Sequence, residues 1–553
     1  MSNISSFFAR FKIHIIVISC ICLGGIVGFK VSQNYTHRQF IQFLNSVTPP
    51  ALQKDKLTEI LSLIDEVYVD SIAIDTLSES MIPKLMKRLD PHSSYIPAKD
   101  FKRVNESLDG EFDGIGIVFN MATDTVIVLN VINNGPSAKA GLMARDRIVM
   151  INDSLVAGQK LDQDYIVSRL RGKRGTKVKL GIERSGVEGL LDVVVKRGKI
   201  PIHSIGASFI IANGVGYINM SQFARTTYRE FIDASNKLMH QGMSSLIIDL
   251  RGNSGGFMDQ AIAIATEFLP KGALIVYTED RDGKREMEFS DREGQMQGLD
   301  LIILIDESSA SSSEIVAGAL QDNDRGTIIG RRSFGKGLVQ RQIPFPDGSA
   351  IRLTSARYFT PTGRSIQKPY KMGEGDNYEN EILARIEHEE LYTVDSIAFA
   401  DSLKFITPGG KTVYGGGGIM PDIFVPVSRE KLPLFFIRVA SNNILYKYTI
   451  EYSDRHRDEL AAIESFEQMD AHFASDKSLV DDFLAYAKRN EYEAKESEIQ
   501  EARIYIERQL KAFIARNTSL EDNGYYNYIY PMDDTLMRAL DELAKIPTDS
   551  LNL

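Results

Sequence analysis

The sequence predicts a multidomain protein with an α/β core and helical regions on both sides of it. Its 553 residues are too many for one hydrophobic core, so three or four domains are expected. From about residue 205, short apolar segments alternate with amphipathic helical segments, which is typical of layered α/β folds. Residues 57–89 instead repeat apolar side chains at helical spacing, and the chain beyond residue 428 is charged and helical.

Composition argues against several classes of function. The chain is 43% hydrophobic and 25% charged, and its net charge of -10 gives no electrostatic reason to expect nucleic acid as a partner. Both cysteines, Cys20 and Cys22, lie in the apolar N-terminal segment. The rest of the chain therefore has neither a disulfide nor a cysteine metal site, and we expect no metal and no other cofactor.

The N-terminal segment predicts a membrane anchor. Residues 13–29 are mostly apolar and are just long enough to span a bilayer. Arg10 and Lys12 precede them, which favours a cytoplasmic tip and an exported remainder. A cleaved signal peptide and lipidation at Cys20 are alternatives, but the apolar run continues nine residues past Cys20. We therefore predict a single-pass protein of a bacterial inner membrane, with its folded part in the periplasm.

Shifts in pattern along the chain predict the domain boundaries. The expected divisions are 1–35 (cytoplasmic tip and anchor), 36–108 (helical region), 109–198 (strand-rich domain), 199–427 (α/β core, with 368–412 as an insertion or lid) and 428–553 (helical region).

The strand-rich domain resembles a PDZ domain. The resemblance rests on GIGI at residues 114–117, GPSAKAGL at 135–142 and RGKRGTKV at 171–178. It implies that the loop of Gly114, Ile115, Gly116 and Ile117 offers backbone N–H groups to the terminal carboxylate of a peptide. That peptide would then add as a strand to the sheet edge.

Five serines fall within residues 308–313, between an apolar strand-like run and a helical pattern. Ser311 and Glu314 have capping-box spacing, so a helix cap is the plainer interpretation. A serine nucleophile needs a base, and none of the eight histidines lies in a recognisable hydrolase setting. Lys336, between two glycines, is the alternative base of a Ser–Lys dyad, although alone it is merely a cation in a turn.

Such a dyad needs supporting groups. The lysine pKa, ordinarily about 10.4, must be lowered by desolvation. Gln340 is a candidate for holding the amine. The backbone N–H of Ser312, with that of Gly255 or Gly256, is a candidate oxyanion hole. A plain strand-to-helix turn is the alternative interpretation of the two glycines.

This combination resembles the carboxyl-terminal processing peptidases, also called tail-specific proteases. The matching motifs follow in one order: LDPHSSYI (89–96), GEFDGIGI (110–117), DLRGNSGG (249–256), SASSSEIVAGAL (309–320), GRRSFGKGLVQ (330–340), TPTGRSIQ (360–367) and GGGGIMPDI (415–423). Ser312 stands where alanine is commoner in the family, and Ser333 where threonine is commoner. Residues 428–553 are not well covered by the resemblance.

The resemblance implies a ClpP/crotonase-like core with an inserted PDZ domain. It also implies a serine endopeptidase in which Ser311 is the nucleophile, Lys336 the base and Gln340 the residue that orients the lysine. Substrates would be proteins or peptides with free C-termini, read by a PDZ domain that gates the site. Arg171 is a candidate link between the PDZ domain and the core, with plain surface charge as the alternative.

Two other functions stay open at this point. An exported scaffold could bind C-termini without cleaving them, and a tethered hydrolase could act on small esters. The presence of both Ser311 and Lys336 favours the protease. A homodimer or an adaptor protein is a further candidate partner, and the sequence does not identify the substrate.

Overall fold

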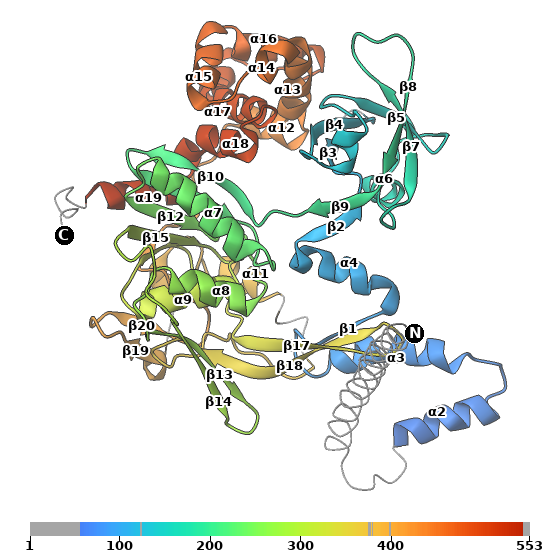
Figure 1. The fold of residues 1–553 in the computed structure, drawn as a ribbon. Coiled ribbons are helices and arrows are strands. Elements are labelled where there is room, and N and C mark those ends of the chain that lie inside the picture. The colour runs from blue at the N-terminus through green and yellow to red at the C-terminus, as the bar shows by residue number, and fades with distance from the viewer. Residues whose placement is uncertain (1–55, 122–123, 374–377, 379, 398–399, 546–553) are drawn as a thin grey trace, which may run out of the picture. The chain divides into compact units, whose positions relative to one another are not determined.

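The computed structural model describes residues 56–121, 124–373, 378, 380–397 and 400–545 (Figure 1). The chain divides into two compact units, Met1–Ile82 and Pro83–Leu553, which are described separately. The predicted anchor at residues 13–29 lies outside the described residues. Within the described ranges, no helix combines the length and the apolar character needed to cross a membrane.

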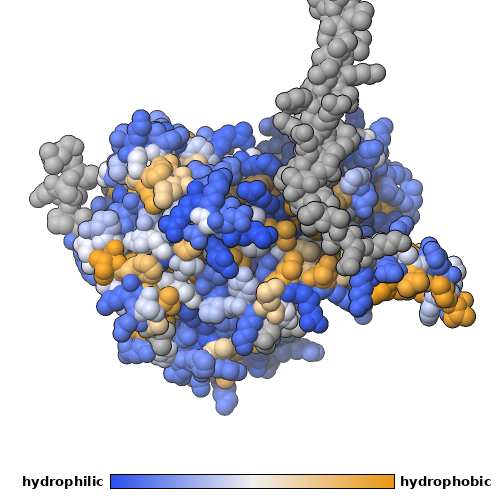
Figure 2. All heavy atoms as spheres, turned by 90° about the horizontal axis from the view of Figure 1, so that it is seen from below, coloured by the Kyte–Doolittle hydropathy of each residue, from blue (hydrophilic) through white to orange (hydrophobic). Residues whose placement is uncertain are grey.

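The first unit contains helix α2 (Lys56–Val67) and most of α3 (Ile74–Met86). Apolar side chains recur along α2 at helical spacing, yet none of its residues is buried. Leu63 is 53% exposed and Val67 is 73% exposed. Figure 2 shows this apolar surface in orange at the right of the view. The helix therefore presents an apolar face that its own unit leaves uncovered.

The second unit is built around a six-stranded sheet. Its strand order is β10 (Ile205–Ala212), β11 (Val215–Met220), β12 (Ser245–Asp249), β15 (Asp300–Ile305), β16 (Thr327–Gly330) and β21 (Ile423–Phe424). Only β10 pairs antiparallel with its neighbour, and the other pairs are parallel. Every residue of β12 is buried, as expected of a parallel strand covered on both faces.

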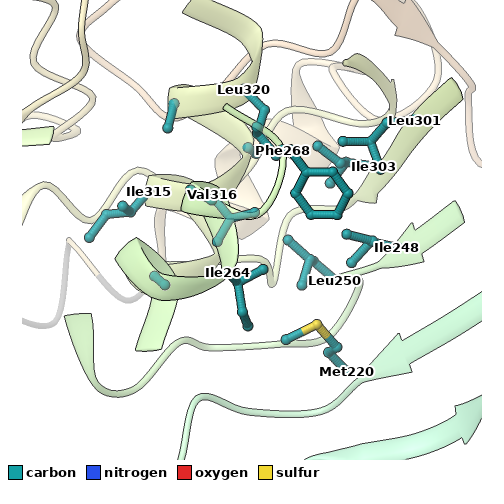
Figure 3. Close-up of a cluster of buried hydrophobic side chains, with 14 of the residues drawn as sticks. Met220, Ile248, Leu250, Ile264, Phe268, Leu301, Ile303, Ile315, Val316 and Leu320 are labelled. Carbon is teal, nitrogen blue, oxygen red and sulfur yellow. The ribbon is translucent and has the colours of Figure 1, made fainter. Parts of the chain in front are cut away.

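Three helices cover one face of this sheet: α7 (Thr227–His240), α8 (Met258–Thr266) and α9 (Ser312–Asp322). In Figure 3, Ile248 and Ile303 from the strands lie near Ile264 of α8, and Val316 and Leu320 of α9. Fully burying each such side chain contributes about 1.5–3 kcal/mol. This core fixes the start of α9, where Ser311 lies.

The opposite face is covered by the C-terminal helix α19 (Asp534–Ala544). Its Leu536, Ala539 and Leu543 share a buried cluster with Tyr217 and Ile247 of the sheet. Helices α12 (Leu434–Ser441), α13 (Ile444–Arg455), α14 (Arg457–Ala461), α15 (Phe466–Ser475), α16 (Leu479–Arg489) and α17 (Glu496–Arg516) form a separate core. A boundary at residue 428 would therefore separate α19 from the sheet on which it packs.

A second, antiparallel sheet supplies one wall of the site. It contains β1 (Ser94–Ile96), β18 (Ala350–Phe359), β13 (Leu274–Asp280), β14 (Arg285–Phe289) and β17 (Leu338–Pro344). Side chains alternate between the faces of a strand, so Arg352 and Thr354 of β18 share one face. The pairing of β18 with β17 shifts register between Thr354 and Ala356, which interrupts this alternation before Tyr358. Gln340 and Gln342 of β17 lie opposite Thr354 and Arg352.

The PDZ-like region has its own sheet and core. The sheet order is β3 (Ile117–Asn120), β4 (Val126–Val131), β5 (Arg147–Ile151), β7 (Lys177–Glu183) and β8 (Leu191–Lys196), with β6 (Ser154–Leu155) beside β5. Two helices accompany it, α5 (Pro136–Lys139) and α6 (Gln163–Leu170). The chain enters through β2 (Glu111–Gly114) and leaves through β9 (Gly198–Pro201), and these two strands pair antiparallel.

Candidate active site

Ser311 lies in the sharp turn between β15 and α9. Its backbone angles are φ 55° and ψ -112°, outside the regions that non-glycine residues normally adopt. In α/β-hydrolases a strained strand-to-helix turn presents a serine hydroxyl above the sheet. Ser311 and Glu314 also form the predicted capping box, in which Glu314 Oε2 accepts the Ser311 N–H at 2.8 Å.

The Glu314 carboxylate connects the serine turn to the lysine loop. It is fully buried, and it also accepts the N–H groups of Gly335 at 2.7 Å and Lys336 at 2.9 Å and the Ser333 hydroxyl at 2.5 Å. Burial raises the pKa of Glu314, while these hydrogen bonds oppose the rise. One side chain therefore fixes the backbone on both sides of the candidate dyad.

Tyr358 makes a second connection between the same two residues. Its hydroxyl lies 3.1 Å from the carbonyl oxygen of Ser311 and 2.6 Å from that of Lys336. The side chain is 1% exposed, and burial raises its pKa well above the usual value. Tyr358 therefore stays protonated at neutral pH and can donate its hydrogen to these carbonyls.

Burial lowers the pKa of Lys336, which is the direction that a base requires. Glu314 and Asp90 oppose the shift through their charges, and Arg352 adds to it. The nearby His92 has its pKa lowered to about 4, by burial and then by Lys336. His92 is therefore neutral at pH 7 and adds no positive charge beside the lysine.

The predicted dyad and its supporting residues line one cavity of about 960 Å³. Its walls include Ser311, Ser312, Gly255, Gly256, Lys336 and Gln340. Helix α4 (Ala98–Asp109) forms the facing wall, with Phe101, Val104, Asn105, Ser107, Leu108 and Asp109. Within the described part of the chain, no hydrogen bond joins Ser311 Oγ to Lys336 Nζ.

The two candidate glycines of the oxyanion hole differ in geometry. Gly255 donates its N–H to Asn253 Oδ1 at 2.9 Å. A Cβ atom on Gly255 would lie 2.8 Å from the Ser311 Cβ, so glycine permits this close approach. Among the described residues, neither Gly256 nor Ser312 has an acceptor for its N–H group. Those two N–H groups are therefore the free pair beside the serine.

Gln340 is held by the sheet behind it. Its Nε2 donates to Thr354 Oγ1 at 3.3 Å, and Thr354 donates to Asp90 Oδ1 at 3.0 Å. In the described ranges, Gln340 makes no hydrogen bond to Lys336. Its role in orienting the lysine stays a prediction.

The loop that carries Gly255 and Gly256 is braced from the C-terminal helix. Arg251 donates to Asp249 at 2.6 and 2.9 Å and to Asp533 at 2.6 and 2.8 Å. Asp533 is the N-cap of α19 and also accepts the N–H groups of Thr535 and Leu536. The last helix is therefore fastened to the start of the glycine loop.

Part of the predicted insertion is fastened to the lysine loop. Arg385, in α11 (Glu381–Glu387), donates to the carbonyls of Ser333 at 2.8 Å and Phe334 at 3.1 Å. Lys368 Nζ lies 3.9 Å from the centre of the Phe334 ring. These contacts make the segment a support of the loop, and its movement as a lid stays a prediction.

The predicted peptide loop lies away from the cavity walls. Gly114 ends β2, Ile117 begins β3, and Ile115 between them is buried. Arg171, at the end of α6, forms an ion pair with Glu106 of α4 at 2.7 Å and stacks over the Phe112 ring. The PDZ-like region therefore contacts the helix that walls the cavity. In the described residues, no group of three or more His, Cys, Asp or Glu side chains is arranged to hold a metal.

Sequence reasoning missed three residues of this site. Tyr358 and Arg352 do not belong to any recognisable catalytic motif. The only signal in the sequence is that they lie shortly before TPTGRSIQ. Asp533 has no such signal, because it lies 282 residues from Arg251 in the sequence.

Three family models match the chain. Peptidase family S41 matches residues 214–373, PDZ domain matches 114–195, and a family of unknown function (DUF8443) matches 435–518. The first match contains Ser311, Lys336 and Gln340.

Curated relatives also match more than half of the chain. A carboxy-terminal-processing protease of Bartonella bacilliformis is 38% identical over 57% of this chain and 73% of the relative. The carboxy-terminal processing protease CtpA of Bacillus subtilis is 34% identical over 57% of this chain and 66% of the relative. A solved PDZ domain of a Vibrio cholerae carboxy-terminal protease, in complex with peptide, is 29% identical over 17% of this chain and 99% of that chain, with a TM-score of 0.16.

Proposed function

Because the chain belongs to the carboxy-terminal processing proteases of peptidase family S41, we propose that it cleaves proteins by a Ser311–Lys336 dyad and an acyl-enzyme intermediate. The observation that carries this proposal is the pair of connections made by Glu314 and Tyr358. They hold Ser311 and Lys336 on the wall of one cavity. Family membership makes the chain a serine-type peptidase, while the dyad and the steps below are our inference.

The reaction begins with the neutral amine of Lys336. Ser311 Oγ attacks the scissile carbonyl, and its proton passes to Lys336 Nζ. The N–H groups of Ser312 and Gly256 stabilise the oxyanion. Collapse of the intermediate breaks the C–N bond, and Lys336 returns the proton to the leaving amine. Water then attacks the ester, with Lys336 again as base, and restores the serine.

The described geometry is compatible with this mechanism although it lacks a direct Ser311–Lys336 hydrogen bond. Catalytic hydrogen bonds are often long before substrate binds. Gln340 supports the mechanism as an acceptor. Its Nε2 is used by Thr354, which leaves its Oε1 available to accept a hydrogen bond from the lysine amine.

We propose that the PDZ domain reads the free C-terminus of the substrate. β3 is an edge strand, and the loop of Gly114, Ile115, Gly116 and Ile117 leads into it. A peptide can therefore add beside β3 while its carboxylate takes backbone N–H groups of the loop. The ion pair of Arg171 with Glu106 supports a route from this domain to the wall of the cavity.

We also propose the predicted location, with the chain anchored in an inner membrane by residues 13–29 and its folded part exported. The uncovered apolar face of α2 supports a protein partner, either a second copy or an adaptor. Fractionation of tagged cells with carbonate washing tests the anchor. Light scattering of the purified full chain in detergent tests the homodimer.

The central test uses an unfolded reporter with a free apolar C-terminus and the same reporter with an amidated end. Ser311→Ala serves as the blank. We expect cleavage of the free-ended reporter, much slower cleavage of the amidated one and none by the blank. A fluorophosphonate probe should also phosphonylate Ser311, with loss of fluoride. Binding of the free C-terminus without cleavage or labelling of Ser311 would instead indicate a scaffold.

A further inference from the structure

One end of the active-site cavity carries an arginine with only neutral partners. Arg352 of β18 donates its Nε to Gln342 Oε1 at 3.1 Å and one NH2 hydrogen to Asn105 Oδ1 at 3.0 Å. All three residues line the same cavity as Ser311 and Lys336. Gln342 comes from the neighbouring strand and Asn105 from α4, so the guanidinium is held between two walls of the cavity.

Arg352 has spare hydrogen-bonding capacity and an uncompensated charge. A guanidinium has five N–H donors, and these contacts use two of them. Among the described residues, no carboxylate lies within 4.0 Å of it. The other arginine of the cavity, Arg225, has such a partner, because Asp109 lies 3.1 Å away. Burial lowers the pKa of Arg352, so the unpaired charge is partly desolvated at a cost to stability.

We propose that Arg352 binds a carboxylate of the substrate, supplied either by its C-terminus or by an aspartate or glutamate side chain. This inference rests on the proposed protease function of the same cavity. The planar guanidinium suits a carboxylate, because two parallel N–H groups can meet its two oxygens. A carboxylate would supply the negative charge that no described protein group supplies.

The strand gives an approximate distance between this carboxylate and the scissile bond. Tyr358, which contacts Ser311, lies six residues from Arg352 on the same strand. At about 3.3 Å per residue their Cα atoms are at most roughly 20 Å apart, because a register shift between them shortens the strand. The arginine side chain is long and lines the same cavity as Ser311, so its guanidinium can lie closer to the serine than its Cα does. We therefore place the substrate carboxylate roughly two to six residues from the scissile bond.

Two peptide series would separate the two sources of carboxylate. In the first, every C-terminus is amidated, and a glutamate or a glutamine stands two, four or six residues after the scissile bond. In the second, no acidic side chain is present, and the chain ends at those positions as a free acid or an amide. Each series is cleaved by the purified full chain and by its Arg352→Gln, Arg352→Lys and Arg341→Gln variants.

Arg341 is a matched control, because it lies beside Gln342 on β17 and is exposed. We expect the unmodified chain to favour the acid over its neutral counterpart by about tenfold or more in kcat/KM at one spacing. Arg352→Gln should abolish that ratio, Arg352→Lys should keep part of it, and Arg341→Gln should keep it whole. If Arg352→Gln does not fold, the test depends on Arg352→Lys, whose ratio of kcat/KM for acid over neutral peptides should be lower than that of the unmodified chain.

Three results would overturn the inference. Equal cleavage of acid and neutral peptides at every spacing would show that the cavity binds no carboxylate. An acid preference that survives in Arg352→Gln would place the carboxylate elsewhere, such as on the PDZ domain. If no Ser311-dependent cleavage is seen and the fluorophosphonate probe does not label Ser311, the protease function is wrong and this inference fails with it.

Discussion

Glu314 accepts the backbone N–H of Lys336 at 2.9 Å, through the same carboxylate oxygen that accepts the N–H of Ser311. The proposed base and nucleophile are therefore held in register by one buried atom, Oε2. An isosteric amide cannot reproduce this, because an NH2 group facing two N–H donors has nothing to accept with.

Glu314→Gln is therefore expected to lower kcat/KM by about 100-fold or more and to destabilise the fold by about 3 kcal/mol. Peptide cleavage and urea unfolding measure the two effects. Glu286→Gln is the control, because Glu286 pairs with Lys284 at an exposed position and its loss should leave both quantities nearly unchanged. Equal losses in the two variants would contradict the role of Glu314.

Lys336 makes activity and stability depend on pH in the same direction. Its folded pKa is lowered by burial, so the neutral base forms at lower pH than in a free lysine, and kcat/KM should rise through that lowered pKa. Between the folded and unfolded pKa values the unfolded chain binds more protons, so the contribution of Lys336 to stability rises with pH and is lost as pH falls.

Lys336→Met is expected to lower kcat by about 10⁴-fold or more and to raise the melting temperature at neutral pH. Peptide cleavage and thermal denaturation at pH 7 measure these changes. Lys271→Met, at an exposed position, should change neither. A lower melting temperature in Lys336→Met would show that the buried amine is a net stabilising group.

Tyr358→Phe removes the hydroxyl that contacts the carbonyls of Ser311 and Lys336 while keeping the ring. We expect kcat to fall by roughly tenfold with little change in KM, and stability to fall by about 1 kcal/mol. Tyr277→Phe is the control on the neighbouring strand, where the ring stacks on Phe359. A change in KM alone would indicate that Tyr358 shapes the peptide site instead.

Local sequence patterns predicted the capped turn at Ser311 but not its surroundings. Ser311 and Lys336 stand in short motifs whose glycines and helix signals can be recognised within about ten residues. The strained φ of Ser311 and the four hydrogen bonds to Glu314 depend on how the Ser311 turn meets the loop that carries Lys336. The spacing of residues within each motif does not determine how the two loops meet.

The C-terminal region was harder still to predict. Charged helical sequence is compatible with a solvated face, and only the packing of Leu536 and Leu543 on the sheet distinguishes α19 from such a helix. The role of Gly255 also changed with the structure. Its N–H donates to Asn253 Oδ1. The sequence motif alone does not show which of the two glycines has a free N–H.

Arg171 provides a test of the link between the PDZ domain and the cavity. The Arg171 side chain is 40% exposed, so the loss of its ion pair with Glu106 should cost little stability and Arg171→Gln should leave the fold intact. We expect it to reduce the preference for free over amidated C-termini by about fivefold. The reason is that loss of the ion pair uncouples the position of α4 from peptide binding at the PDZ domain. Arg169→Gln, in the last turn of α6, is the control. An unchanged preference in Arg171→Gln would leave this ion pair without a role in gating.

Asp533 tests whether the C-terminal helix supports catalysis. Asp533→Asn keeps an N-cap for α19, since asparagine caps as well as aspartate does, but it breaks the bidentate pair with Arg251. Arg251 then keeps only its ion pair with Asp249. The loop that leads to Gly256 loses its attachment to the N-terminus of α19. We expect kcat to fall about tenfold with little change in KM, because the oxyanion donors act mainly in the transition state. Asp534→Asn, the exposed neighbour in the same helical turn, should have no effect. If both variants retain full kcat, then α19 serves only to cover the sheet.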